Sequence, residues 1–239
     1  MDPVFAFFAA LGGYLIGSVS FARLMIRAQG MEGRNELIRR EVEGSDADFV
    51  SDSVGGTTVA EQLGRRLGCL TALLDIAKPI VVILATLAFF PDEHYHLIAG
   101  VFTVVGHNYP VFHRFDGGRG MSTLVGGFLV VDPLGFFATQ LTAMALGIAV
   151  RRVLVLRWSG IVFMIPWLFV VQGVPEGLFA VACNALYWTA MYPEIAQVRR
   201  FQAEGTLPDQ QVIAELLQMG GFWAKVEPYS IPRLLKRRR

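Results

Sequence analysis

The segment that most clearly indicates the fold is Gly106-His107-Asn108-Tyr109-Pro110-Val111-Phe112-His113-Arg114-Phe115-Asp116-Gly117-Gly118-Arg119-Gly120, which joins two apolar runs. It leaves the first run through a proline between aromatic residues and then places Gly117, Gly118 and Gly120 around Arg119. Glycines let backbone N–H groups approach an anion closely, and an arginine adds a planar cationic fork for phosphate or carboxylate oxygens. The same residues also suit a tight cytoplasmic turn that simply carries positive charge. Both interpretations place the segment between membrane-spanning elements.

Composition and charge distribution predict an integral membrane protein. Hydrophobic residues make up 54% of the 239-residue chain, only 17% are charged, and the mean hydropathy is +0.48, which is unlike a soluble domain. Lysines and arginines gather in clusters. The opposite ends of the apolar segments carry only acids, namely Asp2, Asp92, Glu93, Asp132 and Glu176. This segregation is the positive-inside pattern, and no nucleic-acid partner is expected.

The apolar segments predict the number of membrane crossings. A helix needs about 20 apolar residues to span a bilayer, and such segments are Val4–Met25, Leu70–Phe90, Leu97–Phe112, Arg157–Val171 and Leu178–Tyr192. Charge places Arg119 and Arg151 on one side, so residues 121–150 should form a helical hairpin that turns at Asp132, where the next residue is proline. The predicted fold class is all-α, a polytopic membrane helix bundle of about seven transmembrane helices, with the N-terminus outside and the C-terminus cytoplasmic.

Two parts of the chain are predicted to lie in the cytoplasm. We divide the sequence into a membrane domain, residues 1–198, with a cytoplasmic loop inserted at 28–56, and an amphipathic, basic tail, residues 199–239. The loop should contain a short helix at Asn35–Glu43. The tail should contain a helix that opens at Pro208, and its terminal basic residues should contact anionic lipid head groups. The first apolar run lacks a basic leader, so no cleavable signal peptide is expected.

Two cytoplasmic loops carry the residues best suited to a phosphate-bearing ligand. One is the glycine-arginine loop quoted above, with His107 at its mouth. The other, Ser51–Thr58, sets hydroxyls and glycines just ahead of the second span, where they can form an anion nest or a helix cap. Ser18 lies near the cytoplasmic end of the first span. Capping, helix packing or a local hydrogen bond is the structural alternative for each of these residues.

Two further groups of polar residues lie outside these loops. Asp75 and Lys78 lie three residues apart within a span, hence on one helical face, and are interpreted as an ion pair that locks the helix rather than as a proton relay. His94 and His96 are close enough to share a metal, but the sequence supplies no third ligand nearby. We therefore expect no metal site and no cofactor.

The order of these elements resembles the bacterial acyl-phosphate:glycerol-3-phosphate acyltransferase family. The similarity rests on Tyr14–Phe21, Ser51–Gly64, Leu73–Lys78 and Gly106–Gly120, where Arg119 replaces a family lysine. The resemblance implies an inner-membrane enzyme of seven helices with a cytoplasmic active face. Such an enzyme transfers an acyl chain from acyl phosphate to glycerol 3-phosphate, forming lysophosphatidate for phospholipid biosynthesis without a metal or coenzyme A.

The resemblance also implies roles for individual residues. The catalytic residues it implies are Ser51, His107 and Arg119. The substrate-binding residues it implies are Ser18, Ser53, Gly55, Thr58, Gly117, Gly118 and Gly120. No covalent enzyme intermediate is expected, so positioning and charge stabilisation should provide most of the rate. The expected partners are the two substrates and membrane lipids.

The chain departs from the family pattern at several site positions. The family Ser-Gly-Asn reads Ser51-Asp52-Ser53, a phosphate-binding arginine is replaced by Glu61, and the positions of a C-terminal His-x-x-Asn carry Met191 and Glu194. Carboxylates repel phosphate. Two hypotheses therefore stand: a divergent acyltransferase, and a catalytically degenerate relative that binds a lipid or a partner protein on the same scaffold.

Overall fold

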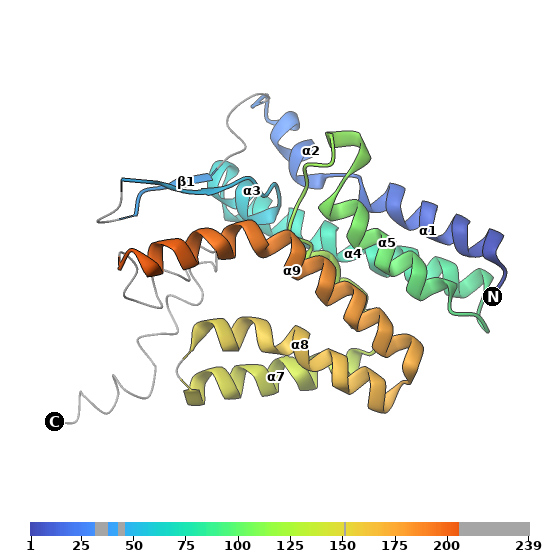
Figure 1. Cartoon of the computed structure of the whole chain (residues 1–239). Coiled ribbons are helices and arrows are strands. Elements are labelled where there is room, and N and C mark those ends of the chain that lie inside the picture. The colour runs from blue at the N-terminus through green and yellow to red at the C-terminus, as the bar shows by residue number, and fades with distance from the viewer. Residues whose placement is uncertain (32–37, 43–45, 151, 206–239) are drawn as a thin grey trace.

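The computed structural model describes residues 1–31, 38–42, 46–150 and 152–205, and is helical apart from one two-stranded sheet (Figure 1). The elements are, in chain order, α1 (Pro3–Gly17), α2 (Phe21–Ala28), β1 (Ile38–Arg40), β2 (Phe49–Ser51), α3 (Gly56–Leu63), α4 (Arg65–Phe89), α5 (Tyr95–Asn108), the 3-10 turn η1 (Val111–His113), α6 (Met121–Val131), α7 (Pro133–Val150), α8 (Val153–Val171) and α9 (Val174–Ala203). The expected tail helix at Pro208 lies outside the described residues.

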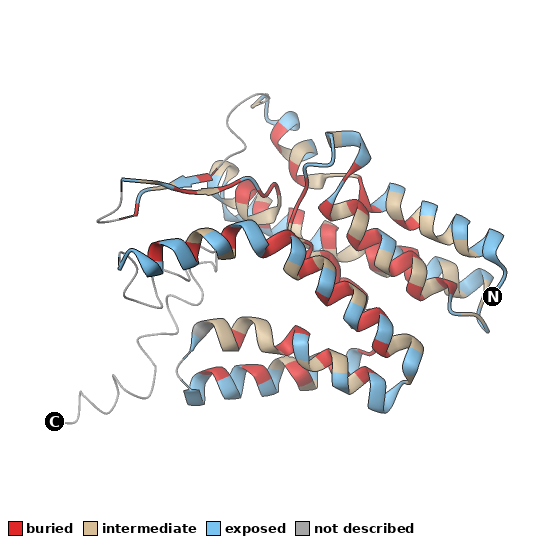
Figure 2. Ribbon diagram, viewed as in Figure 1, coloured by how far each residue is buried: buried red, intermediate tan, exposed pale blue. Residues whose placement is uncertain are grey.

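Several helices have the length and apolar surface that a bilayer requires. In the described part of the chain, four segments are long and apolar enough to cross a membrane: Pro3–Ala28, which comprises α1 and α2, Arg65–Phe89, Pro133–Val150 and Leu154–Val171. Helix α6 is apolar but shorter. The outer faces of these helices are exposed (Figure 2), and large apolar side chains such as Phe7, Leu73 and Leu141 lie on them. The predicted helical membrane protein is thus confirmed, whereas the count of seven spans stays a prediction.

Helix α9 holds the bundle together. It runs between a group formed by α1, α4 and α5 and the pair formed by α7 and α8 (Figure 1). Buried aromatic rings join it to α6, because Phe179 and Phe128 meet edge to face with their centroids 5.9 Å apart. On the other side of the bundle, α1 touches the backbone of α5. A Cβ on Gly17 would lie 2.2 Å from the Thr103 carbonyl oxygen, so the absence of a side chain at Gly17 allows the two helices to pack closely.

Two helix boundaries differ from the predicted spans. The first helix does not run unbroken to Met25, because it ends at Gly17 and α2 begins at Phe21. Ser20 accepts a hydrogen bond from the Arg23 amide and caps α2, and such local bonding competes with a continuous helix. Helix α5 ends at Asn108 rather than continuing to residue 112, because Pro110 cannot continue the helical hydrogen bonding.

The prediction of a short helix at Asn35–Glu43 is wrong at residues 38–42, the part of this range that the structure describes. Residues 38–40 instead form a strand that pairs antiparallel with β2, with Ile38 opposite Ser51 and Arg40 opposite Phe49. Ile38 and Phe49 are buried. The side-chain amide of Gln197 in α9 clamps β2: its Nε2 donates to the Val50 carbonyl at 2.8 Å, and its Oε1 accepts from the Val50 amide at 2.9 Å. The sheet therefore holds Ser51 against α9.

The expected break at Asp132 separates α6 from α7. The Asp132 carboxylate accepts hydrogen bonds from the Gly135 amide at 2.7 Å, from Trp167 Nε1 at 2.9 Å and from Gln172 Nε2 at 3.2 Å. An acid that looked like a topology marker therefore also ties the start of α7 to the end of α8.

Candidate functional site

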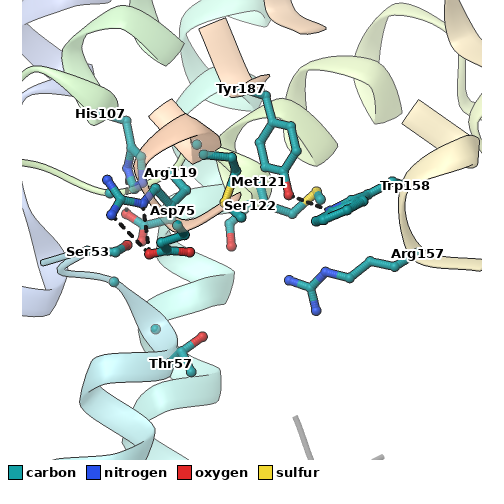
Figure 3. Close-up of a pocket in the computed structure, with 16 residues that line it drawn as sticks. Ser53, Thr57, Asp75, His107, Arg119, Met121, Ser122, Arg157, Trp158 and Tyr187 are labelled. Atoms are coloured by element: carbon teal, nitrogen blue, oxygen red, sulfur yellow. Dashed lines mark hydrogen bonds and ion pairs between the residues drawn. The ribbon is translucent and has the colours of Figure 1, made fainter. Parts of the chain in front are cut away.

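A polar pocket lies where the two glycine-containing loops meet α4, α5, α8 and α9 (Figure 3). Its lining combines backbone from both loops with cationic, acidic and aromatic side chains. The lining residues are Ser53, Gly55, Gly56, Thr57, Asp75, His107, Gly118, Arg119, Gly120, Met121, Ser122, Arg157, Trp158, Tyr187, Met191 and Glu194. The two loops that the sequence marked as suited to a phosphate-bearing ligand therefore meet at one pocket.

Arg119 is held by two carboxylates. Its Nε and Nη2 donate to Glu194 Oε1 at 3.1 and 2.9 Å, and Nη2 also donates to Asp52 Oδ1. Glu194 is almost fully buried, whereas Asp52 is largely exposed. Burial by itself lowers the pKa of the Arg119 guanidinium, but the Glu194 and Asp52 carboxylates outweigh it and raise that pKa above its ordinary value. Arg119 is therefore a permanent cation whose charge is already balanced within the protein.

Glycines place Arg119 by allowing its loop to lie directly on the end of α5. The Gly118 amide donates to the His107 carbonyl at 3.1 Å. A Cβ on Gly117 would lie 2.4 Å from that carbonyl oxygen, and one on Gly118 would lie 2.2 Å from His107 Nε2. Gly120 has φ +81°, a left-handed conformation that favours glycine. Each of the three glycines therefore has a steric or conformational reason for its position.

The second loop is tied to the first and to α9. The Val54 amide donates to the Gly117 carbonyl at 3.3 Å, which joins the two loops directly. Ser51 is buried and donates from Oγ to Glu194 Oε1 at 2.6 Å. Thr58 turns back to donate to the Ser53 carbonyl at 2.6 Å. Ser51 and Thr58 thus support the loop from behind, whereas Ser53 lines the pocket.

The predicted site residues divide into three groups by position. Those that line the pocket are His107, Arg119, Ser53, Gly55, Gly118 and Gly120, and those that belong to the two loops but not to the lining are Ser51, Thr58 and Gly117. Ser18 belongs to neither group, because its hydroxyl donates to the Tyr14 carbonyl at 2.8 Å and accepts from the Val111 amide at 3.4 Å. The structure therefore gives Ser18 a role in joining α1 to the turn after α5.

The buried pair in α4 borders the pocket. Lys78 Nζ lies 2.8 Å from Asp75 Oδ1 and 4.9 Å from the centroid of the Phe21 ring. His107 Nδ1 lies 3.6 Å from the same Asp75 oxygen. Both charged side chains are only 3% exposed, and a buried ion pair with such contacts fits the predicted structural lock. Through Asp75, this lock also supports the position of His107.

Arg157, Trp158 and Tyr187 are among the pocket residues that were not predicted as site residues. Trp158 Nε1 donates to the Tyr187 hydroxyl at 2.8 Å, and Arg157 interacts with that hydroxyl as well. Arg157 and Arg119 lie on opposite sides of the pocket (Figure 3). In the part of the chain that the structure describes, no carboxylate is paired with Arg157. The sequence signal was an arginine at the cytoplasmic end of a span, which was used only to assign topology.

Two of the three acids at departed positions, Glu61 and Glu194, differ in their placement. Glu61 forms an ion pair with Arg40, one residue of the sheet, and is not in the pocket lining. Glu194, in contrast, occupies the pocket and neutralises Arg119. The pocket thus offers two guanidinium groups and loop backbone to an anion, while Glu194 and Asp52 compete for one of those guanidinium groups.

Comparisons with known proteins agree on one family. Residues 7–201 match the family model described as "Glycerol-3-phosphate acyltransferase". The chain is 36% identical over 139 residues to glycerol-3-phosphate acyltransferase 5 of Dehalococcoides mccartyi. This match covers 58% of this chain and 54% of that protein. It is 32% identical over 129 residues to the glycerol-3-phosphate acyltransferase of Aquifex aeolicus. This second match covers 54% of this chain and 60% of that protein. The matches therefore span less than two thirds of these relatives' lengths.

Solved structures show the same relationship in three dimensions. The fold matches the crystal structure of PlsY (YgiH), an integral membrane glycerol 3-phosphate acyltransferase, in its lysophosphatidic acid form with a TM-score of 0.64 and 26% sequence identity. This match covers 82% of this chain and 92% of that chain. The glycerol 3-phosphate form of the same protein gives a TM-score of 0.63.

Proposed function

Because the chain belongs to the glycerol-3-phosphate acyltransferase family, we propose that it is a membrane enzyme that transfers an acyl chain from acyl phosphate to glycerol 3-phosphate. The products are lysophosphatidate, which enters phospholipid biosynthesis, and inorganic phosphate. The observation that carries this proposal is the pair of guanidinium groups, Arg119 and Arg157, that face one pocket together with the loop backbone of Gly118 and Gly120. Two substrates that each bear a phosphate group need two such cationic positions.

The proposed reaction requires no covalent bond to the protein. The acceptor hydroxyl oxygen bonds to the acyl carbonyl carbon, the bond from that carbon to the phosphate oxygen breaks, and the hydroxyl proton leaves with phosphate or to solvent. Arg119 would stabilise charge on the departing phosphate, and His107 would orient a substrate oxygen. Ser51 reaches the pocket only through its hydrogen bond to Glu194, so its role would be to position that carboxylate.

A second candidate function rests on the carboxylates in the site. Arg119 already contacts Glu194 and Asp52, so an incoming phosphate must displace or tolerate two negative charges. A relative that had lost turnover would retain the scaffold and bind a lipid or a partner protein. The proposed enzyme and this alternative make different predictions for product formation, which the experiment below measures.

The proposal includes an orientation in the membrane. We place α1, α4, α5, α6, α7, α8 and α9 as seven spans of the inner membrane, with the N-terminus outside and the pocket on the cytoplasmic face. The clustering of lysine and arginine near the pocket end of these helices supports this orientation. Residues 1–198 would form the membrane domain, and residues 199–239 would be a tail on the lipid head groups.

The test uses the purified full chain in detergent with acyl phosphate and glycerol 3-phosphate, and follows release of inorganic phosphate together with formation of lysophosphatidate. We expect turnover by the natural protein and loss of more than about 100-fold in Arg119→Ala, since removing one charge-stabilising donor costs about that much. Arg114→Ala is the matched control, because Arg114 is an exposed arginine of the same loop outside the pocket lining.

Three outcomes separate the hypotheses. Turnover that is lost in Arg119→Ala and kept in Arg114→Ala supports the enzyme. Thermal stabilisation by glycerol 3-phosphate without product, again dependent on Arg119, supports the binding relative. Neither turnover nor stabilisation by phosphate-bearing ligands would show that the pocket is not an anion site.

A further inference from the structure

A second group of polar side chains lies at the end of α5 that is remote from His107. His94 caps the start of α5, His96 lies in its first turn, and Glu176 lies in the first turn of α9. Each offers one ligand atom, and these atoms all lie within 4.8 Å of one another. At about 1.5 Å per residue, α5 separates the group from the pocket by about 20 Å. The group is therefore independent of the proposed function.

We propose that His94, His96 and Glu176 bind one Zn²⁺ ion. Two imidazoles and one carboxylate are a donor set of known zinc sites, in which a water molecule completes a tetrahedral shell. Ca²⁺ and Mg²⁺ prefer oxygen ligands only, so the two nitrogen donors select zinc or a neighbouring transition metal. The sequence provided the two histidines without a third ligand nearby. The fold supplies that ligand, Glu176, from 82 positions after His94 and 80 positions after His96.

Local contacts prepare these side chains for a metal. His96 Nδ1 lies 3.1 Å from the Glu93 carbonyl oxygen, and a proton donated there leaves the Nε2 lone pair for an ion. Glu176 lies in the first turn of α9, where the helix dipole favours a carboxylate. His94 Nδ1 lies 3.7 Å from Glu176 Oε1, which is too long for a hydrogen bond.

The 3.7 Å between His94 Nδ1 and Glu176 Oε1 is instead close to the spacing of two ligand atoms bound to one metal ion. Ligand bonds of about 2.1 Å at a tetrahedral ion place neighbouring ligand atoms about 3.4 Å apart. The ligand atoms lie within 4.8 Å of one another, so the widest spacing must close by up to about 1.4 Å to reach this value. The side chain of His94 is 49% exposed, so it can rotate without disturbing the core. A bound ion would cross-link the α4–α5 turn to the start of α9.

The competing interpretation is an ion pair between Glu176 and a protonated His94, which requires no metal. The test uses the full chain in detergent, with any polyhistidine tag removed and metals stripped by a chelator. Zn²⁺ is then added while bound metal and the thermal unfolding midpoint are measured. We expect one Zn²⁺ per chain and a higher unfolding midpoint.

Variants locate the ion. His94→Ala and Glu176→Gln should each weaken Zn²⁺ binding by at least about tenfold, the lower bound for disturbing even an outer-shell partner. Glu93→Gln is the matched control: it removes a neighbouring carboxylate but keeps the carbonyl that contacts His96, so Zn²⁺ binding should stay unchanged. Unfolding midpoints measured with chelator present report whether each variant is folded.

The outcomes are decisive in both directions. Failure of the natural protein to bind stoichiometric Zn²⁺ overturns the proposal, as does equal affinity in the double variant His94→Ala, Glu176→Gln. Visible absorption of the natural protein with Co²⁺ gives a measurement that needs no variant. A tetrahedral spectrum supports the site, and the weak spectrum of the free aqueous ion overturns it.

Discussion

Glu194→Gln tests the central electrostatic feature of the pocket. The substitution keeps the size of the side chain and an oxygen that accepts from Ser51 and Arg119, but it removes the buried negative charge. A phosphate bound at Arg119 would then no longer be repelled by the Glu194 carboxylate. The Arg119 guanidinium would also be free of the carboxylate that competes most strongly with phosphate for it. We therefore expect tighter binding of every phosphate-bearing ligand.

The magnitude follows from Coulomb's law. For a phosphate about 6 Å from Glu194, with an effective dielectric constant of about 20, the repulsion per unit charge is about 2.8 kcal/mol. The pocket is open to solvent and Asp52 is 57% exposed, so we halve this value to about 1.4 kcal/mol, which corresponds to about a tenfold change in affinity. The KM for glycerol 3-phosphate should fall by about this factor.

Two measurements assess the result. Steady-state phosphate release separates KM from kcat, and stabilisation by inorganic phosphate against thermal unfolding reports affinity even without turnover. Glu204→Gln is the matched control, because Glu204 lies at the end of the same helix and pairs with Arg200. An unchanged or higher KM, together with unchanged phosphate affinity, would refute the electrostatic reasoning. A collapse of kcat at unaltered phosphate affinity would instead assign Glu194 to the chemical step.

Two further variants test the rest of the pocket. Arg157→Ala should weaken phosphate-bearing ligands by about tenfold or more, because hydrogen bonds to charged groups contribute about 1.5–3 kcal/mol, whereas the exposed Arg152→Ala should leave ligand affinity unchanged. Gly117→Ala should lower stability by roughly 1–3 kcal/mol, as overpacking does, because its Cβ would meet backbone oxygen at 2.4 Å. Gly55→Ala, which meets nothing within 4 Å, is its control in thermal unfolding, and equal midpoints would contradict the packing argument.

The sequence predicted the features that depend on local chemistry. Charge segregation and apolar length indicated a helical membrane protein, and Pro133 located the break after α6. The end of α1 was missed because Ser18 and Ser20 interrupt a segment that remains apolar on average. The strand at Ile38 was missed because its stability depends on pairing with β2, which Gln197 clamps from 147 residues away.

The site shows the same division between local and distant information. The glycine loop was recognisable because its residues are contiguous, and two departures, Asp52 and Glu194, were identified one position at a time. Both contact Arg119, from which Asp52 is 67 positions away and Glu194 is 75 positions away. A local sequence pattern cannot reveal contacts over such distances. The positive-inside pattern already explained Arg157, so nothing in the sequence indicated that it lines the pocket.

The hydrogen bond from the Val54 amide to the Gly117 carbonyl has a consequence for local unfolding. Because it joins the two loops, opening either loop removes a backbone hydrogen bond from the other. We therefore predict that the two loops open together, so that amide protons of both loops exchange with solvent through the same opening event. A ligand that contacts only Arg119 would then slow amide exchange in the Ser51–Thr58 loop as well, and both loops would gain or lose order together.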